Sequence, residues 1–196
     1  MISLINAASA SFNQVKMSHG KALIDGGAIH VTGTGAVSVT FSNCPSESPM
    51  AYFESVRNGG FLYVTNPSLT LATNGCKWNH LRAGNIGGFM YGSVASMDMS
   101  NCDLTNITAG AGGSFMQTAL NTFNFKLSTC NVNCNPSPST GSSILFNTPN
   151  IGSFFDIASA SSVISINNTY KNCYTASYGA IYRLSSTTFN DQLSVY

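Results

Sequence analysis

The chain of 196 residues is long enough for one domain with a substantial apolar core, and no change of composition indicates a second domain. Hydrophobic residues make up 43% of it, which excludes a disordered polymer, whereas charged residues make up only 8%, far below the ~25% of ordinary soluble domains. The formal net charge of +1 comes from scattered charges, which excludes an electrostatic footprint for nucleic acid. The apolar runs are too short to span a membrane.

Residues 1–25 contain short apolar stretches between serines, asparagines and alanines, and they predict an incomplete first coil of a repeat structure. The opening MISLINAASA has no cationic segment, and its apolar run is shorter than that of a signal peptide. We therefore expect either that a targeting segment has been removed or that the chain is a piece of a longer polypeptide.

A glycine-led apolar motif recurs from residue 26 onward. Its copies are Gly26-Gly27-Ala28-Ile29-His30-Val31, Gly59-Gly60-Phe61-Leu62-Tyr63-Val64, Gly87-Gly88-Phe89-Met90-Tyr91, Gly112-Gly113-Ser114-Phe115-Met116, Gly152-Ser153-Phe154-Phe155 and Gly179-Ala180-Ile181-Tyr182. The first four copies start 33, 28 and 25 residues apart, which is a solenoid period with turns of variable length.

Each repeat continues with strictly alternating apolar and polar residues, which predicts a strand. These segments cover residues 36–41, 68–71, 96–99, 123–127 and 163–166. A corner with asparagine or cysteine follows each of them, at Ser42-Asn43-Cys44, Asn74-Gly75-Cys76, Ser100-Asn101-Cys102, Ser128-Thr129-Cys130 and Asn172-Cys173. A less regular stretch then leads to the next glycine pair.

This repeat predicts an all-β fold, a right-handed parallel β-helix of about six irregular coils, because one coil cannot bury its apolar side chains until others stack on it. The single domain covers residues 1–196, with the main coils at 26–184 and a terminal strand at 185–196. The alternative is a β-sandwich, which is also made of short strands and turns but does not need one motif to return in every coil.

GGAIHV, GGFLYV and GGFMYG, between turns rich in asparagine, serine, threonine and cysteine, resemble the repeats of polymorphic outer membrane proteins. Those repeats belong to the pectate-lyase-like superfamily of right-handed parallel β-helices. The resemblance covers about residues 1–184, but only Gly26-Gly27-Ala28-Ile29 has the strict GGA[ILV] form, and the companion Phe-x-x-Asn tetrapeptide is absent. It implies a surface-exposed or secreted β-helix with a structural or adhesive role.

Six cysteines are candidates for disulfides: Cys44, Cys76, Cys102, Cys130, Cys134 and Cys173. The first four fall at equivalent corners, where stacked coils would bring them within bonding range. We expect Cys44 to pair with Cys76, Cys102 with Cys130 and Cys134 with Cys173, which is one of several connectivities that six cysteines allow. The alternative is a set of buried reduced thiols. No metal is expected, because Cys130 and Cys134 have no partner pair at zinc spacing.

Two N-glycosylation acceptors, Asn106 and Asn167, begin the sequons Asn106-Ile107-Thr108 and Asn167-Asn168-Thr169. Such sequons also arise by chance in a chain rich in asparagine and threonine. Together with the cysteines they favour an extracellular or cell-surface location.

The aromatic residues Phe61, Tyr63, Phe89, Tyr91, Phe115, Phe154, Phe155 and Tyr182 occupy matched places in the glycine-led segments. They predict an aromatic stack in the core or along one face; the alternative is a sugar-binding platform of exposed tyrosines. Trp78 lies in an expected turn, either locally packed or exposed as an anchor. We expect His19, His30 and His80 at the surface or at corners.

The sequence predicts no catalytic residue, no cofactor and no metal. Hydrolysis of polysaccharides requires clustered carboxylates, and elimination requires a calcium site and a base, whereas this chain has seven acids, among them Asp25, Asp98, Asp103 and Asp156, in no catalytic pattern. Ice binding would need regular Thr-x-Thr ladders, and Thr32-Gly33-Thr34 does not recur in register.

These patterns predict a non-enzymatic extracellular structural protein, a glycosylated β-helix that stacks end to end into a filament or surface scaffold. Both ends read as uncapped, so we expect self-association unless flanking coils of a longer polypeptide cover them. The alternatives are a cell-surface adhesin or glycan-binding β-helix and, second, a polysaccharide lyase or hydrolase. No nucleic acid and no membrane span are expected among its partners.

Overall fold

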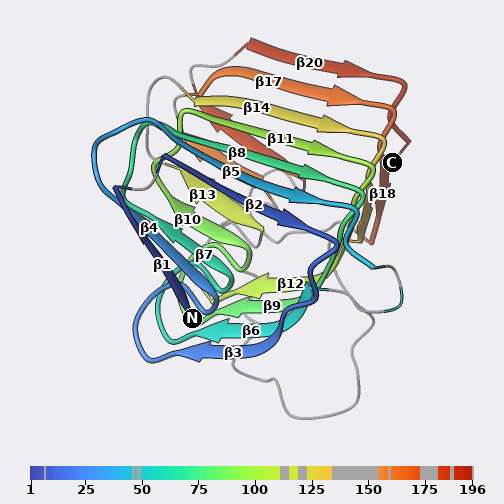
Figure 1. The fold of residues 1–196 in the computed structure, drawn as a ribbon. Coiled ribbons are helices and arrows are strands. Elements are labelled where there is room, and N and C mark those ends of the chain that lie inside the picture. The colour runs from blue at the N-terminus through green and yellow to red at the C-terminus, as the bar shows by residue number, and fades with distance from the viewer. Residues whose placement is uncertain are drawn as a thin grey trace.

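The computed structural model describes residues 1–6, 8–45, 47, 50–110, 115–118, 123–133, 155–158, 160–172, 181–185 and 188–195. Over these residues the chain forms 20 strands and no helix. The strands make three parallel sheets, here called I, II and III, which face one another around a shared interior (Figure 1).

Sheet I contains β1 (Ile2–Ile5), β4 (Ile29–Thr32), β7 (Leu62–Val64), β10 (Met90–Gly92), β13 (Met116–Thr118), β16 (Phe155–Ala158) and β19 (Tyr182–Ser185). Sheet II contains β2 (Ser9–Asn13), β5 (Val37–Ser42), β8 (Leu69–Asn74), β11 (Ser96–Ser100), β14 (Phe123–Ser128), β17 (Ala160–Ile166) and β20 (Thr188–Gln192). Sheet III contains β3 (Ser18–Ala22), β6 (Met50–Ser55), β9 (Lys77–Ala83), β12 (Asp103–Ala109), β15 (Asn131–Asn133) and β18 (Thr169–Lys171).

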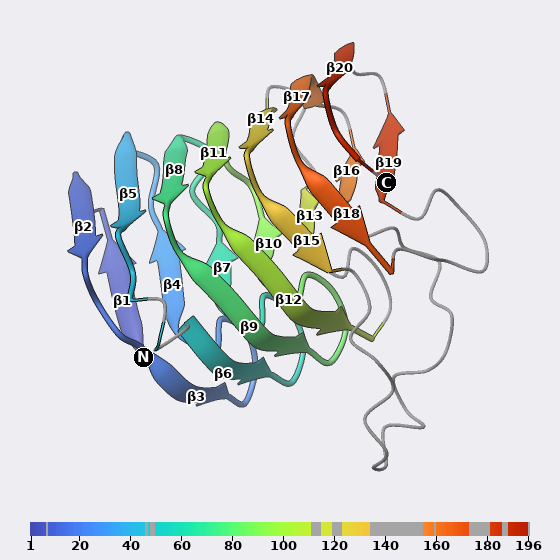
Figure 2. The same ribbon diagram turned by 90° about the vertical axis from the view of Figure 1, so that its right-hand side faces the viewer.

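Every third strand along the chain returns to the same sheet and pairs in parallel with the strand three before it, as β4 does with β1 and β7. The strands therefore step from the N-terminal to the C-terminal end in sequence order (Figure 2). This arrangement is a parallel β-solenoid, and it confirms the all-β solenoid predicted from the repeat. It excludes the β-sandwich alternative, whose sheets would be antiparallel.

The glycine-led segments form sheet I and the alternating segments form sheet II, as the repeat predicts. The less regular stretches form sheet III, whose strands the sequence did not predict. Their alternation is broken because a residue with positive φ lies inside or directly after the strand. His19 (φ 61°), Tyr52 (φ 62°) and His80 (φ 50°) hold this position in β3, β6 and β9. Residues 1–25, expected to be an incomplete coil, contain one strand of each sheet, and residues 185–196 contain β20.

The glycine pairs stack vertically at the corner between sheets III and I. Gly26, Gly59 and Gly87 have φ of 68°, 63° and 68°, a conformation that glycine adopts without strain. The second glycine of each pair lies against the next coil, since a Cβ on Gly27 would stand 2.0 Å from the Gly60 oxygen. Recurrence of the pair thus reflects direct contact between coils.

A second column of positive-φ residues forms the corner between sheets II and III, with Asn43, Gly75, Asn101, Thr129 and Asn167 in successive coils. The Asn101 amide donates to the Asn74 side-chain oxygen of the preceding coil (2.9 Å), and the Asn43 amide donates to Asn13 in the same way (3.3 Å). Asparagine suits this column because it tolerates the left-handed conformation.

One predicted corner is wrong. Asn172-Cys173 was expected to be equivalent to the four cysteine corners, but Asn131 pairs with Thr169, so Asn168 is the residue that stacks on Cys130. Asn172 belongs to a different column, where its amide donates to Asn133 (3.0 Å). Variable turn lengths make the sequence spacing ambiguous at this coil. Cys173 itself lies outside the described residues.

The interior is filled by stacked aromatic and aliphatic side chains. Phe61, Phe89 and Phe115 are fully buried, with ring centroids 5.7 Å and 4.6 Å apart between neighbours, so the predicted aromatic stack is confirmed for these phenylalanines. Trp78 is fully buried on β9 with its ring edge-on to Phe89, so it is neither in a turn nor an exposed anchor. Phe154 lies outside the described residues.

Candidate functional site

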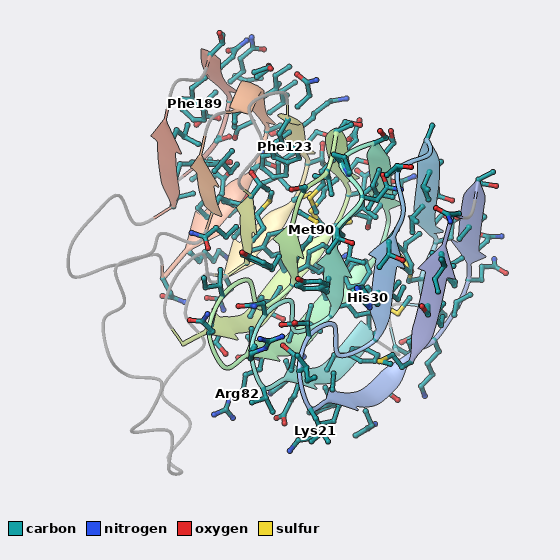
Figure 3. The ribbon with its side chains drawn as sticks, turned by 90° about the vertical axis from the view of Figure 1, so that its left-hand side faces the viewer. Lys21, His30, Arg82, Met90, Phe123 and Phe189 are labelled. Atoms are coloured by element: carbon teal, nitrogen blue, oxygen red, sulfur yellow. A yellow bond between two sulfur atoms is a disulfide. The ribbon has the colours of Figure 1, made fainter. Side chains whose placement is uncertain are left out.

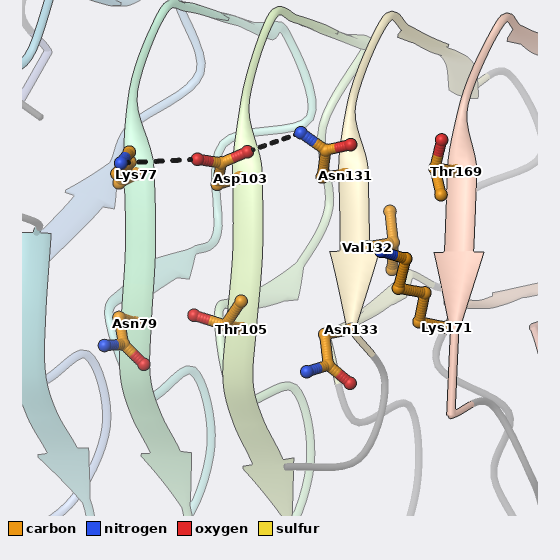
Figure 4. Close-up of a pocket in the computed structure, with 9 residues that line it drawn as sticks. All are labelled: Lys77, Asn79, Asp103, Thr105, Asn131, Val132, Asn133, Thr169 and Lys171. Carbon is orange, nitrogen blue, oxygen red and sulfur yellow. Dashed lines mark hydrogen bonds and ion pairs between the residues drawn. The ribbon is translucent and has the colours of Figure 1, made fainter.

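The outer face of sheet III carries a shallow hollow of about 350 Å³ (Figure 4). It is lined by residues of four neighbouring strands, all of them on the outer face except the buried Val132: Lys77 and Asn79 on β9, Asp103 and Thr105 on β12, Asn131, Val132 and Asn133 on β15, and Thr169 and Lys171 on β18. Successive outward residues of a strand point to the same face, so the strand register itself places these groups together.

The lining side chains form two in-register rows. The upper row in Figure 4 runs Lys77, Asp103, Asn131 and Thr169, and the lower row runs Asn79, Thr105, Asn133 and Lys171. Asp103 holds its neighbours: its Oδ2 lies 3.6 Å from Lys77 Nζ, and its Oδ1 accepts a hydrogen bond from Asn131 Nδ2 at 2.8 Å.

Most of the residues that line this hollow carry polar side chains. Amides, hydroxyls and lysines offer donors, and Asp103 and the asparagine oxygens offer acceptors. Glycosidic hydrolysis requires two carboxyl groups, and this hollow contains one, already engaged by Lys77 and Asn131. Sequence reasoning missed the hollow because it located no strand in the less regular stretches that form sheet III.

The carboxylates elsewhere are held in separate contacts. Asp98 lies on the outer face of sheet II with Lys126 Nζ at 3.5 Å, whereas Asp103 lies on sheet III, so the two acids predicted on one coil face different directions. Asp25 binds Arg57 (2.7 Å) and the Asn58 backbone NH (3.0 Å) at the glycine corner. The Asp156 side chain lies outside the described residues.

Two aromatic columns lie on outer faces, and the middle ring of each column, Tyr63 or Tyr52, has an aromatic neighbour on both sides. On sheet I, His30 meets Tyr63 edge-on, and Tyr63 stacks on Tyr91 with centroids 5.9 Å apart. Partial burial, followed by the charge of Asp25, raises the pKa of Tyr63. On sheet III, Tyr52 stands between His19 (4.9 Å) and His80 (4.7 Å). Sugar stacking needs an open ring face, so these columns do not support the platform alternative.

Of the three expected cysteine pairs, Cys44–Cys76 is confirmed and Cys102–Cys130 is wrong, whereas Cys134 and Cys173 lie outside the described residues. Cys44 and Cys76 form a disulfide with a Cα separation of 4.7 Å, as expected from their corners. Cys102 and Cys130 are buried free thiols, stacked in register although not bonded to each other. A hydrogen bond from Cys130 lowers the pKa of Cys102 to about 7, while the same contact and burial raise the pKa of Cys130.

The two sequons differ in geometry. Asn167 is exposed at the corner between sheets II and III, and its backbone NH donates to Gln192 O at 2.8 Å. Asn106 is half-buried on β12, beside the sheet III hollow, with its amide donating to Asn79 Oδ1 at 2.8 Å. Asn167 therefore has more room for a glycan than Asn106.

A buried polar network near the C-terminal end was not predicted. Ser165 contacts the hydroxyls of Tyr170 (3.1 Å) and Ser194 (3.2 Å), and Asn168 Nδ2 donates to Ser165 (3.1 Å). The Tyr170 hydroxyl also meets the Tyr182 hydroxyl. Burial raises the pKa of Tyr170 to about 12 and also raises the pKa of Tyr182 well above its usual value. Serine and asparagine at inward positions of the last coils were the available signal.

Comparisons with protein-family models, curated proteins and solved structures give no match to this chain. In the described part of the chain, no helix has the length and apolar character required to cross a membrane. The same residues contain no cluster of three or more histidine, cysteine or acidic side chains arranged to hold a metal ion.

Proposed function

We propose that this protein is a non-enzymatic structural subunit, a right-handed β-helix of about six coils that stacks end to end into an extracellular filament or scaffold. The observation that carries the proposal is the state of the two ends. Strands β1, β2 and β3 have no partner on their outer edge among the described residues, and neither do β19 and β20 at the opposite end.

Apolar side chains accompany these open edges. Ile2, Leu4 and Phe12 are only partly buried although they pack against the core, while Phe189 (44%) and Leu193 (83%) are exposed at the other end. Figure 3 shows Phe189 at the C-terminal end of the stack. Because all strands of a sheet run in the same direction, a second copy can continue each sheet head to tail.

The disulfide Cys44–Cys76 and the exposed sequon at Asn167 support the extracellular location. We expect Asn167 to carry an N-linked glycan in preference to Asn106. Expression through a secretory pathway followed by peptide mass spectrometry tests this, and a glycan found at Asn106 alone would contradict it.

End-to-end stacking is tested by analytical ultracentrifugation and negative-stain microscopy over a range of concentrations. Wild type should form rods that lengthen with concentration. Leu193→Lys places a charge at the exposed end without touching the core and should abolish lengthening, whereas Asn190→Lys, on the outer face of β20, should not. Monodisperse single particles of wild type at all concentrations would refute the polymer and leave flanking coils as the cover for the ends.

A second candidate function is glycan binding, which the polar hollow on sheet III favours. Hydroxyl and amide rows of this kind match the donors and acceptors of a sugar. Oligosaccharide binding measured by calorimetry should weaken about tenfold in Thr105→Val, which removes one hydroxyl from the hollow. Thr70→Val, on the outer face of sheet II, is the matched control. Equal affinities in all three proteins, or no binding at all, would remove this candidate.

A further inference from the structure

Four cysteines lie one above another on the inner side of the corner between sheets II and III. Cys44 is bonded to Cys76, and the Asp103 NH donates to Cys76 O (3.1 Å), which places Cys102 on the next coil above Cys76. The Asn131 NH donates to Cys102 O (2.9 Å), which places Cys130 on the coil after that. The four cysteines thus occupy the same position in four successive coils, and successive coils lie one strand spacing, ~4.8 Å, apart.

The two free thiols point back along this column. Cys102 Sγ lies 3.3 Å from Thr73 Oγ1 and 3.7 Å from Thr73 O, and Thr73 belongs to the coil of Cys76. Cys130 Sγ lies 3.7 Å from Met99 O, which belongs to the coil of Cys102. Each free thiol also contacts a carbonyl of its own coil, Cys102 Sγ with Ser100 O (3.1 Å) and Cys130 Sγ with Ser128 O (3.3 Å), and so lies between its own coil and the one before it.

The environment also distinguishes the two thiols. The hydrogen bond from Cys130, assisted by Thr73, lowers the pKa of Cys102 to about 7, so a large fraction of Cys102 is thiolate near neutral pH. The pKa of Cys130 is raised, so Cys130 keeps its proton. A thiol whose pKa is close to the ambient pH is the most effective attacking group in thiol–disulfide exchange.

We propose that this column is an internal disulfide relay, in which the bond passes from Cys44–Cys76 to Cys76–Cys102 and then to Cys102–Cys130. In the first step the Cys102 thiolate attacks Cys76 Sγ, the Cys76–Cys102 bond forms, and Cys44 leaves as a thiolate. In the second step Cys102, now bonded to Cys76, no longer holds the proton of Cys130. Cys130 releases this proton to solvent and attacks Cys102 Sγ, Cys76 leaves as a thiolate, and the Cys44 thiolate takes up a proton from solvent. The number of disulfides does not change, so no outside oxidant is needed.

The burial of Cys102 and Cys130 favours exchange within the column over exchange with molecules in solution. Cys102 and Cys130 are each 1% exposed, so an external thiol or oxidant reaches them poorly, whereas their neighbours in the column are one strand spacing away, within the Cα range of a disulfide. Val15 precedes the column and Asn168 follows it, so the relay has four positions. The relay lets the solenoid move its covalent link between coils, and it does not depend on the proposed scaffold function.

Peptide mapping can resolve the relay because trypsin separates the four cysteines. Cleavage after Lys21, Arg57, Lys77, Arg82 and Lys126 places Cys44 in 22–57, Cys76 in 58–77, Cys102 in 83–126 and Cys130 in the peptide that starts at 127. The protein carries Cys134→Ser and Cys173→Ser, so that only the column can exchange. Samples held at pH 5 or pH 8 are denatured in acid with N-ethylmaleimide, digested and analysed by mass spectrometry.

We expect peptides linked through Cys76–Cys102 and Cys102–Cys130 to appear at pH 8 and to grow with time. At pH 5 their rate of appearance should fall about a hundredfold, because the thiolate fraction drops about tenfold per pH unit below a pKa of about 7. Cys102→Ser should lose both new links, whereas Cys130→Ser should lose only the second.

Detection of only the Cys44–Cys76 link in the four-cysteine protein, at both pH values and after prolonged incubation, would overturn the relay. So would a rate of appearance of the new links that rises in proportion to protein concentration, because the links would then arise by exchange between molecules. Peptide mapping of the four-cysteine protein tests the relay even if Cys102→Ser or Cys130→Ser fails to fold.

Discussion

Gly27 shows what a single residue contributes where two coils meet. A Cβ at this position would stand 2.0 Å from the Gly60 oxygen and 2.7 Å from the Glu54 oxygen, and both are backbone atoms that cannot move aside. The glycine pairs therefore recur because the stack has no room for a side chain there. The first glycine of each pair has a second reason to be glycine, because its positive φ is a conformation that other residues adopt only with strain.

We predict that Gly27→Ala lowers the free energy of unfolding by about 3 kcal/mol through overpacking. Gly35→Ala is the matched control: a Cβ there meets no atom within 4 Å, and its change should stay within about 0.5 kcal/mol. Urea denaturation followed by circular dichroism measures both. Equal effects of the two substitutions would contradict the close stacking of the corner.

Tyr170 makes stability depend on alkaline pH. The unfolded chain releases the phenolic proton near pH ~10, whereas the folded protein holds it to about pH 12. The contribution of Tyr170 to the free energy of unfolding should therefore be fully present below pH ~10. Above pH ~10 this contribution should fall by about 1.4 kcal/mol per pH unit.

Tyr170→Phe should cost about 1 kcal/mol at pH 7, where it loses its hydroxyl contacts, and should flatten the decline between pH 10 and pH 11. Tyr52→Phe, at a half-exposed position, is the control and should leave both values near those of wild type. Denaturation curves at pH 7, 10 and 11 measure the effect. An unchanged alkaline slope in Tyr170→Phe would show that other groups cause it.

At the scale of the element, strand β9 shows why alternation alone was not enough to find sheet III. Trp78, Leu81 and Ala83 point inward while Asn79 and His80 are both turned outward, because His80 adopts positive φ and shifts the pattern by one residue. The alternation of apolar and polar residues that predicts a strand is therefore interrupted at His80. Sheet II has no such interruption, and its strands were predicted closely.

Trp78 on β9 gives this element an optical signal, since it is the only tryptophan of the chain. Its ring lies 5.3 Å, 4.9 Å and 4.9 Å from Phe41, Phe61 and Phe89, which come from three successive coils. We predict blue-shifted fluorescence that acrylamide quenches poorly and that moves to longer wavelength on unfolding. Red-shifted emission from the folded protein would contradict its burial.

The same contacts set the cost of losing the ring. Trp78→Ala should lower the free energy of unfolding by about 4 kcal/mol, because it removes a fully buried side chain and leaves a cavity. Phe189→Ala, at a position that is 44% exposed, should cost about 1 kcal/mol or less. Thermal and urea denaturation compare the two variants.

At the scale of the whole molecule, stability is a sum of contacts between neighbouring coils, so position along the stack decides the cost of a substitution. Leu71 lies in β8 with coils on both sides and is fully buried, whereas Leu4 lies in the first strand and is only partly buried. The two residues are chemically identical and make a matched pair.

We predict that Leu71→Ala costs about 3 kcal/mol and Leu4→Ala about 1 kcal/mol. Hydrogen exchange should show the same gradient, with the amides of β8 protected and those of β1 exchanging early. Equal costs would contradict the open N-terminal end and, with it, the end-to-end stacking proposed above.

The solenoid class could be predicted from the sequence alone because each coil rests on its neighbour, so the same residue types must return wherever coils touch. That argument found sheets I and II, the glycine corner, the bonded pair Cys44–Cys76 and the stack of phenylalanines. It depends only on recurrence along the chain.

Only the tertiary structure decided which residues share a column where turn lengths differ. It placed Asn168, not Cys173, above Cys130, buried Trp78, and brought Lys77, Asp103 and Asn131 into one row of a polar hollow. The physical reason is that register between coils is set by backbone hydrogen bonds across the stack, and a variable turn or a left-handed residue within a strand hides that register from any count along the sequence.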